Sequence, residues 1–162
     1  MQKLSENKNI TLVELDVTSK ASIQNAYSFV SKATGGTLDI LYHNAGVRSI
    51  VLGMHSDWEL AEKTFQANLF SVVEMNRVFM PLVMKAGVGS KIVFSNSVAA
   101  VTPVPTTSIY NASKAALNMY AKVLHMELLP LGIHVVDVMT GEVGTTMAEQ
   151  SMEKLPEGMH KN

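Results

Sequence analysis

The sequence contains no cysteine among its 162 residues and no excess of either charge sign. Without cysteine, disulfide scaffolds and thiolate-bound zinc or iron–sulfur centres are excluded. The 13 basic and 14 acidic residues give a formal net charge of −1, too small to attract nucleic acid or an anionic membrane. No apolar run reaches the ~18 residues of a membrane-spanning helix, and the five histidines are scattered without metal-ligand spacing. We therefore expect no nucleic-acid partner, no membrane span and no metal site.

The composition is typical of a protein with a folded hydrophobic core. Hydrophobic residues make up 47% of the chain, charged residues 17%, and the mean hydropathy is +0.16. These values exclude intrinsic disorder, and the length indicates about one domain. The polar stretch MQKLSENKN at the start does not have the pattern of a signal peptide, so we expect a cytoplasmic location.

Short segments rich in Ile, Val and Leu alternate with helical patterns along the chain. The predicted strands are Ile10–Leu15, Leu38–His43, Lys91–Ser95 and Ile133–Met139. The predicted helices are Ser22–Ala33, Asp57–Lys85 and Tyr110–Leu129. In the second helix, Pro81 should cause a bend or a break. The alternation indicates an α/β fold, a doubly wound parallel sheet with helices on both faces, over residues 1–148, followed by a polar tail at 149–162.

Small, hydrogen-bonding residues follow every predicted strand. They are Asp16-Val17-Thr18, Asn44-Ala45-Gly46, Ser95-Asn96-Ser97 and Thr140-Gly141-Glu142-Val143. Any one of these groups is explained by the turn that must end a strand. Because doubly wound sheets bind ligands at the carboxyl ends of their strands, all four together indicate a ligand site there.

Tyr110 and Lys114 are four residues apart and therefore share one face of a predicted helix. A free tyrosine has a pKa of ~10, and a neighbouring ammonium lowers this pKa toward the range that acid–base catalysis requires. Ser97 lies 13 residues before Tyr110 at the end of a predicted strand, where its hydroxyl can meet the tyrosine and a substrate oxygen. Taken alone, the Tyr–Lys pair is more typical of an exposed helix face than of a catalytic site.

The run KIVFSNSVAAVTPVPTTSIYNASKAALNMYAKVLHMEL resembles the catalytic segment of the short-chain dehydrogenase/reductase family, which has a serine at this spacing before Tyr-x-x-x-Lys. Other motifs agree in order and separation. HNAG at 43–46 is similar to the family's Asn-Asn-Ala-Gly, and Asn68 lies where the family has a helix asparagine. TGEVGT at 140–145 is similar to Pro-Gly-x-Val-x-Thr, with threonine in place of proline.

The resemblance implies a Rossmann-like catalytic domain that reduces a carbonyl group to an alcohol. Tyr110 would protonate the carbonyl oxygen, Lys114 would hold the nicotinamide ribose and lower the pKa of Tyr110, and Ser97 would orient the carbonyl. Asn68 would connect Lys114 to solvent through a proton relay. The implied cofactor is NADP, with NAD as the alternative. Its implied contacts are Asp16, Val17, Asn44, Ala45, Gly46, Tyr110, Lys114, Gly141, Val143 and Thr145.

Within the family, LDILYHNAG, KIVFSNS and SIYNASKAAL look like the fungal 1-acyl-dihydroxyacetone phosphate reductase branch. This resemblance implies a lipid-like ketone substrate and association with the endoplasmic reticulum or lipid droplets. The family's two long helices also form a dimer interface, which implies a homo-oligomer.

The family's glycine-rich loop, Thr-Gly-x-x-x-Gly-x-Gly, has no counterpart in this sequence. We therefore expect an N-terminally truncated, partial sheet that lacks the family's first two strands and its last. In such a sheet Ile10–Leu15 loses its usual neighbour or pairs in an unusual way. Two functions remain open: the carbonyl-reducing oxidoreductase, and a truncated non-catalytic remnant or fragment that cannot bind cofactor by itself.

Overall fold

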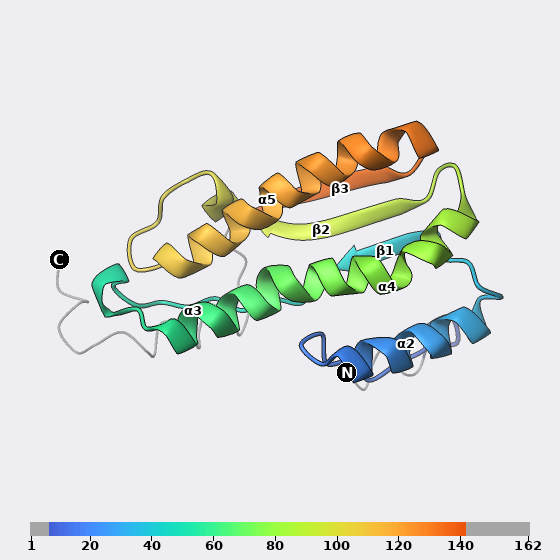
Figure 1. The fold of residues 1–162 in the computed structure, drawn as a ribbon, viewed down its shortest axis with the longest axis horizontal. Coiled ribbons are helices and arrows are strands. Elements are labelled where there is room, and N and C mark those ends of the chain that lie inside the picture. The colour runs from blue at the N-terminus through green and yellow to red at the C-terminus, as the bar shows by residue number, and fades with distance from the viewer. Residues whose placement is uncertain (1–6, 142–162) are drawn as a thin grey trace.

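The computed structural model describes residues 7–141 (Figure 1). Its helices are α2 (Lys20–Ala33), α3 (Trp58–Phe65), α4 (Ser71–Ala86) and α5 (Ser108–Leu128). Its strands are β1 (Ile40–His43), β2 (Lys91–Ser97) and β3 (His134–Thr140). A π-helical turn, Gln66–Phe70, joins α3 to α4, and short 3-10 turns occupy Gly53–His55, Val98–Ala100 and Leu129–Leu131. The predicted boundary at residue 148 lies outside the described residues.

The strands form one parallel sheet in the order β1-β2-β3, which confirms the partial α/β sheet expected from the sequence. Leu41 lies beside Ile92 in this sheet, and Ile92 lies beside Val135. Helices α4 and α5 run across one face of the sheet (Figure 1). The core lies between these two layers, because α5 presents buried residues at helical spacing to the buried side chains of β2.

The opposite face of the sheet is not covered within the described part of the chain. Ile40 and Tyr42 of β1 are 52% and 53% exposed, whereas the alternate residue Leu41 is buried. On β3, Val136 and Val138 are likewise exposed. The expectation of helices on both faces is therefore wrong for residues 7–141, where α2 packs against α4 instead.

The predicted strand Ile10–Leu15 is also wrong. Residues 10–15 form no strand, and Ile10, Leu12, Val13 and Leu15 are between 38% and 52% exposed. A strand must satisfy its backbone N–H and C=O groups against a neighbour, and none of the three described strands pairs with this segment. An apolar, β-branched sequence without a partner strand therefore remains irregular.

The predicted helix Asp57–Lys85 forms, but it is not one uniform α-helix. Asp57 caps its start, because its carboxylate accepts a hydrogen bond of 2.8 Å from the Leu60 N–H. The π-helical turn then interrupts the α pattern, and Pro81 does not break the helix, which continues to Ala86. Burial of Phe79 and Val83 on either side of Pro81 holds this last turn against the sheet layer.

Candidate functional site

The candidate site lies at the carboxyl ends of the parallel strands, where the first turns of α5 pass the end of β2 (Figure 1). One contact joins the helix to the strand directly: the Lys114 ammonium donates a hydrogen bond of 2.9 Å to the Ser95 carbonyl oxygen. This contact brings Lys114 to β2, while the predicted cluster of Ser97, Tyr110 and Lys114 stays a prediction.

Tyr110 and Lys114 share one face of α5, as their spacing predicts. Lys114 Nζ lies 5.9 Å from the centroid of the Tyr110 ring. Lys114 is only 7% exposed, whereas Tyr110 is half-buried. Burial holds the pKa of the Lys114 ammonium below its usual value, while the nearby Asp137 carboxylate acts in the opposite direction.

Asn68 occupies the middle of the π-helical turn and is 1% exposed. Its Oδ1 accepts a hydrogen bond of 2.8 Å from the Val47 N–H, and its Nδ2 donates to the Val47 carbonyl at 2.9 Å. The same Nδ2 donates to Ser113 Oγ at 2.9 Å, and Ser113 Oγ donates to the Tyr110 carbonyl at 2.8 Å. Asn68 therefore fixes the first turn of α5 to the chain that follows β1.

Ser113 is the functional neighbour that sequence reasoning missed. It is fully buried and lies three residues after Tyr110, on the side of α5 that faces Asn68. The signal for it was available in the Asn-Ala-Ser-Lys run, where a serine directly precedes the paired lysine. What the sequence did not reveal is the partner, because Asn68 is 45 residues away in the chain.

Gly46 brings the segment after β1 into contact with both groups. A Cβ atom at this position would lie 3.1 Å from Asn68 Oδ1 and 3.7 Å from Lys114 Nζ. Asn44, two residues earlier, accepts a hydrogen bond of 2.9 Å from the Ser95 hydroxyl, while Ala45 is exposed. Four predicted motifs, from β1, the π-helical turn, β2 and α5, thus meet at this edge of the sheet.

Ser97 ends β2, where its hydroxyl accepts a hydrogen bond of 3.1 Å from the Ala99 N–H and caps the short turn Val98–Ala100. Among the described residues, no hydrogen bond links Ser97 to Tyr110 or Lys114. The catalytic role of Ser97 therefore stays a prediction.

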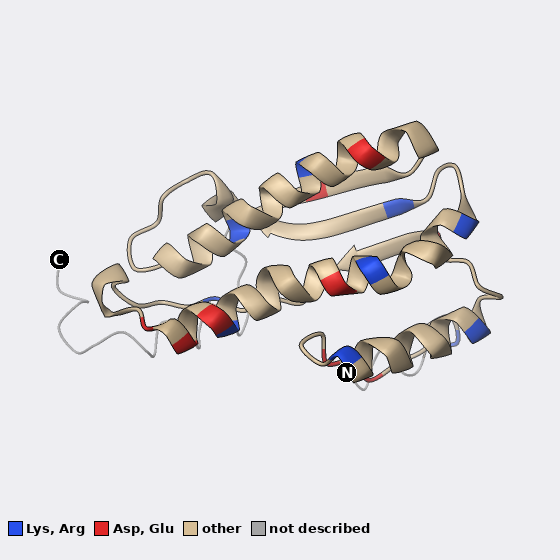
Figure 2. Ribbon diagram, viewed as in Figure 1, with Lys and Arg blue, Asp and Glu red and all other residues tan. Residues whose placement is uncertain are grey.

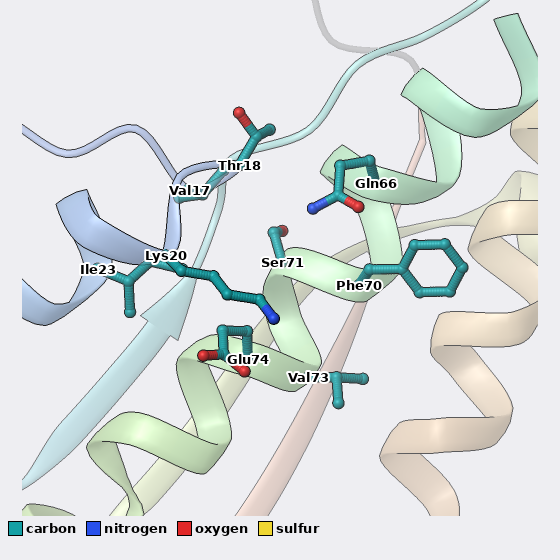
Figure 3. A pocket seen from close by; sticks show the side chains of 9 residues that line it. All are labelled: Val17, Thr18, Lys20, Ile23, Gln66, Phe70, Ser71, Val73 and Glu74. Atoms are coloured by element: carbon teal, nitrogen blue, oxygen red, sulfur yellow. The ribbon is translucent and has the colours of Figure 1, made fainter. Parts of the chain in front are cut away.

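Other predicted cofactor residues lie apart from this cluster. Val17 lines a hollow of about 300 Å³, open to solvent, between the start of α2 and the start of α4 (Figure 3). Gln66 and Phe70, on the π-helical turn, line its other side. Asp16 is not part of the lining: its carboxylate accepts two hydrogen bonds from Thr18, which hold the pKa of Asp16 below its usual value.

Gly141 is exposed after β3, and a Cβ atom at this position would meet no other atom within 4 Å among the described residues. Val143 and Thr145 lie outside the described residues. Charged side chains are sparse on the described helices, and neither sign gathers into a cluster in this view (Figure 2). Within residues 7–141 no group of three His, Asp or Glu could hold a metal ion, and no helix is long and apolar enough to cross a membrane.

A parallel sheet in the order β1-β2-β3 with helices α4 and α5 on one face places the chain in the class of Rossmann-like α/β folds. Comparison with known proteins makes this class specific. The family model described as short chain dehydrogenase matches residues 1–156. The chain belongs to the short-chain dehydrogenase/reductase family.

Curated relatives of the chain include fungal short-chain dehydrogenases. The short-chain dehydrogenase cctT of Talaromyces islandicus is 40% identical over 138 residues, which cover 85% of this chain and 48% of that protein. The NADPH-dependent 1-acyldihydroxyacetone phosphate reductase of Saccharomyces cerevisiae is 34% identical over 159 residues, which cover 94% of this chain and 53% of that protein. The chain thus spans about half the length of the curated relatives it matches.

Solved structures agree with this assignment. A short chain dehydrogenase from Burkholderia cenocepacia in complex with NADP superposes with a TM-score of 0.79 at 26% identity, covering 89% of this chain and 60% of that one. A short-chain dehydrogenase from Streptomyces avermitilis superposes with a TM-score of 0.76 at 27% identity, covering 83% and 49%. Both similarities support the Rossmann-like fold.

Proposed function

We propose that this protein is an NAD(P)H-dependent oxidoreductase that reduces a carbonyl group to an alcohol. The observation that carries the proposal is the buried Lys114 ammonium, 5.9 Å from the Tyr110 ring, at the carboxyl edge of a parallel sheet. The family assignment favours this function over a non-catalytic remnant, because the tyrosine, lysine and asparagine expected of the family occupy one site.

In the proposed reaction, Tyr110 Oη donates its proton to the carbonyl oxygen of the substrate. The Lys114 ammonium stabilises the phenolate that this transfer leaves behind. Ser97 would donate a hydrogen bond to the same oxygen and hold the carbonyl in place. Asn68 would fix the first turn of α5 through Ser113 and pass protons between Lys114 and solvent.

The residues at the carboxyl edge suit the ribose end of a nicotinamide cofactor. Gly46 has no side chain where a Cβ would approach Asn68 and Lys114, so both side chains can come close to the backbone that follows β1. Lys114 donates one described hydrogen bond, to Ser95, and an ammonium has two further N–H groups for ribose hydroxyls. When bound, the cofactor supplies the hydride.

We assign the remaining cofactor contacts by the family pattern. Val17 lines the hollow beside α2, which is a suitable place for the adenine end, with Asp16 beside it. The other proposed contacts are Asn44, Ala45, Gly46, Tyr110, Lys114, Gly141, Val143 and Thr145. NADPH is the preferred cofactor, because the Saccharomyces relative is named an NADPH-dependent enzyme, and NADH is the alternative.

A lipid-like ketone such as an acyl-dihydroxyacetone phosphate is the proposed substrate, since the same relative is named for it. That substrate would bring the protein to the endoplasmic reticulum or to lipid droplets. Apolar side chains exposed on α4 and α5 support a homo-oligomer formed through these helices. They include Val73, Met84, Met119, Val123 and Met126. Residues 1–148 would form the catalytic region and 149–162 a tail.

The acid–base role is tested with Tyr110→Phe, which removes only the proton-bearing oxygen. We expect a fall in kcat of about 10²- to 10⁴-fold in NADPH-dependent reduction of an acyl-dihydroxyacetone phosphate, followed by NADPH absorbance. Tyr27→Phe is the matched control, because Tyr27 packs edge-on against Phe79 away from the site. Equal turnover by Tyr110→Phe and the unsubstituted protein would overturn the assignment of Tyr110.

Binding is tested separately by calorimetry with NADPH and NADH. We expect heat of binding for the 162-residue chain and its loss in Lys114→Ala, because that change removes the donor to the ribose. No detectable binding of either nucleotide by the unsubstituted chain would support the remnant function instead.

A further inference from the structure

A carboxylate lies between the sheet and α5, in a layer where most side chains are apolar. Asp137 of β3 pairs in register with the fully buried Phe94 of β2 and shares its face of the sheet. Asp137 Oδ2 accepts hydrogen bonds from Asn96 Nδ2 at 3.0 Å and from Asn118 Nδ2 at 2.7 Å. Its Oδ1 is buried and has no hydrogen-bond partner among the described residues.

Each of these asparagines is tied to a proposed catalytic residue. Asn96 is 2% exposed and precedes Ser97, whose N–H donates to Asn96 Oδ1 at 2.9 Å. Asn118 lies one helical turn after Lys114, on the same face of α5. Asp137 therefore connects the end of β2 that carries Ser97 to the turn of α5 that follows Lys114.

Charge adds to this connection. Two neutral amides satisfy one carboxylate oxygen but do not cancel its charge, and an uncompensated charge is costly to bury. Lys114 is the cation on which this charge acts. Its described hydrogen bond is to a neutral carbonyl, and burial disfavours its charged form. The described groups around Lys114 are the Ser95 carbonyl of β2, the backbone at Gly46 and the Tyr110 ring from its own helix, and Asp137 of β3 acts on it as a negative charge.

We propose that Asp137 is a positioning residue that fixes the Ser97 strand end against the Lys114 helix through Asn96 and Asn118 and places a negative charge beside this part of α5. Its importance for catalysis rests on the proposed function, whereas the electrostatic pairing itself does not. Hydrogen bonding alone would not require a carboxylate here, because an asparagine side chain of the same shape also carries an acceptor oxygen. The test must therefore separate charge from shape.

The experiment follows the titration of the Lys114 Cε resonance by NMR in protein labelled at lysine, with Lys114→Arg used to assign the signal. Asp137→Asn removes the charge and keeps the shape, so we expect the Lys114 midpoint to move to lower pH. Asp39→Asn is the matched control, because Asp39 is exposed at the opposite end of the strands and should leave the midpoint unchanged. The exchanged pair Asp137→Asn with Asn118→Asp returns a carboxylate to the same contact and should restore the midpoint.

A folded Asp137→Asn protein in which Lys114 titrates as in the unsubstituted protein would overturn the proposal. If Asp137→Asn does not fold, the unsubstituted protein decides: the Lys114 Cε shift must show an inflection at the pH at which Asp137 Cγ titrates, and its absence would refute the pairing. None of these readouts needs cofactor or substrate. Failure of carbonyl reduction with the Lys114 shift intact would therefore reject the proposed function and leave the Asp137–Lys114 pairing standing.

Discussion

His43 replaces the first asparagine of the Asn-Asn-Ala-Gly pattern, and the structure gives it a role in the core. It is 9% exposed and stacks on Phe94 with 5.1 Å between ring centroids. Its Nε2 lies 2.8 Å from Asn76 Oδ1, and Asn76 Nδ2 donates to Tyr120 Oη at 3.1 Å. Because the amide oxygen accepts, Nε2 carries the proton. Through these contacts His43 joins β1 to both α4 and α5.

This burial predicts a pH dependence of stability. Burial lowers the pKa of His43 from 6.5 to about 4, so between these values the unfolded chain binds a proton that the folded chain does not. The free energy of unfolding should therefore fall as the pH drops from 6.5 toward 4, by about 3 kcal/mol in total. Urea unfolding at a series of pH values, in the unsubstituted protein and in His43→Gln, measures the difference.

His55→Gln is the control for that measurement, since His55 is exposed. Its pH profile should match that of the unsubstituted protein. If His43→Gln retained the full acid-induced loss, other groups would have to account for it.

At the scale of single residues, the sequence predicts best which side chains share one face of the same helix. Tyr110 and Lys114 face the same way because four residues make about one turn. By contrast, the contacts of Asn68 with Val47 and Ser113 span 21 and 45 residues. No local pattern predicts such contacts, since they depend on how separate elements pack.

The π-helical turn Gln66–Phe70 is the element on which the site depends most. A π-turn contains one more residue per turn than an α-turn, and such turns are frequent at functional sites. Here the turn directs Asn68 toward α5 and places Gln66 and Phe70 on the hollow. Trp58, at the start of α3 before the turn, is 81% exposed.

Asn68→Ala should destabilise the protein strongly, because it removes a buried side chain that hydrogen-bonds the N–H and C=O of Val47 and the buried hydroxyl of Ser113. We expect a loss of about 3 kcal/mol in the free energy of unfolding, measured by urea denaturation. Asn9→Ala, at an exposed position, should change it by less than about 0.5 kcal/mol. A comparable effect of the two substitutions would contradict the assigned hydrogen-bond network.

The element pattern itself was largely predictable. Three of the four strands and all three long helices form near their predicted positions, because hydrophobic periodicity is a local property. The exception is Ile10–Leu15. A strand forms only where a neighbouring strand satisfies its backbone groups, and the local sequence does not show whether such a neighbour is present. The π-helical turn was not predictable either, because a single extra residue leaves the average helical spacing almost unchanged.

At the scale of the whole molecule, residues 7–141 are arranged asymmetrically about the sheet. One face packs against α4 and α5, while the other carries exposed apolar side chains in the described part of the chain. Parallel sheets are usually covered on both faces, so this arrangement is unusual for the class. The partial sheet was predicted from the missing glycine-rich loop, but the bare face was not, because helix patterns do not say which side a helix will cover.

A matched pair of isoleucines measures this asymmetry. Ile92 is fully buried on the helix side, whereas Ile40, on the neighbouring strand, is 52% exposed on the other side. We expect Ile92→Ala to lower the free energy of unfolding by about 2–5 kcal/mol, and Ile40→Ala by less than about 1 kcal/mol. Chemical denaturation of both variants would show this, and an equal loss would mean that the second face is covered in solution.

The π-helical turn also determines which mutations this segment of the gene can tolerate. Removing one residue from 66–70 would restore an ordinary α-helical turn and rotate everything before it by about 100° relative to α4. The hydrogen bonds between Asn68, Val47 and Ser113 could not survive that rotation. This segment should therefore accept many codon substitutions on its exposed side. The loss of a single codon there, however, would separate Asn68 from Val47 and from Ser113 of α5.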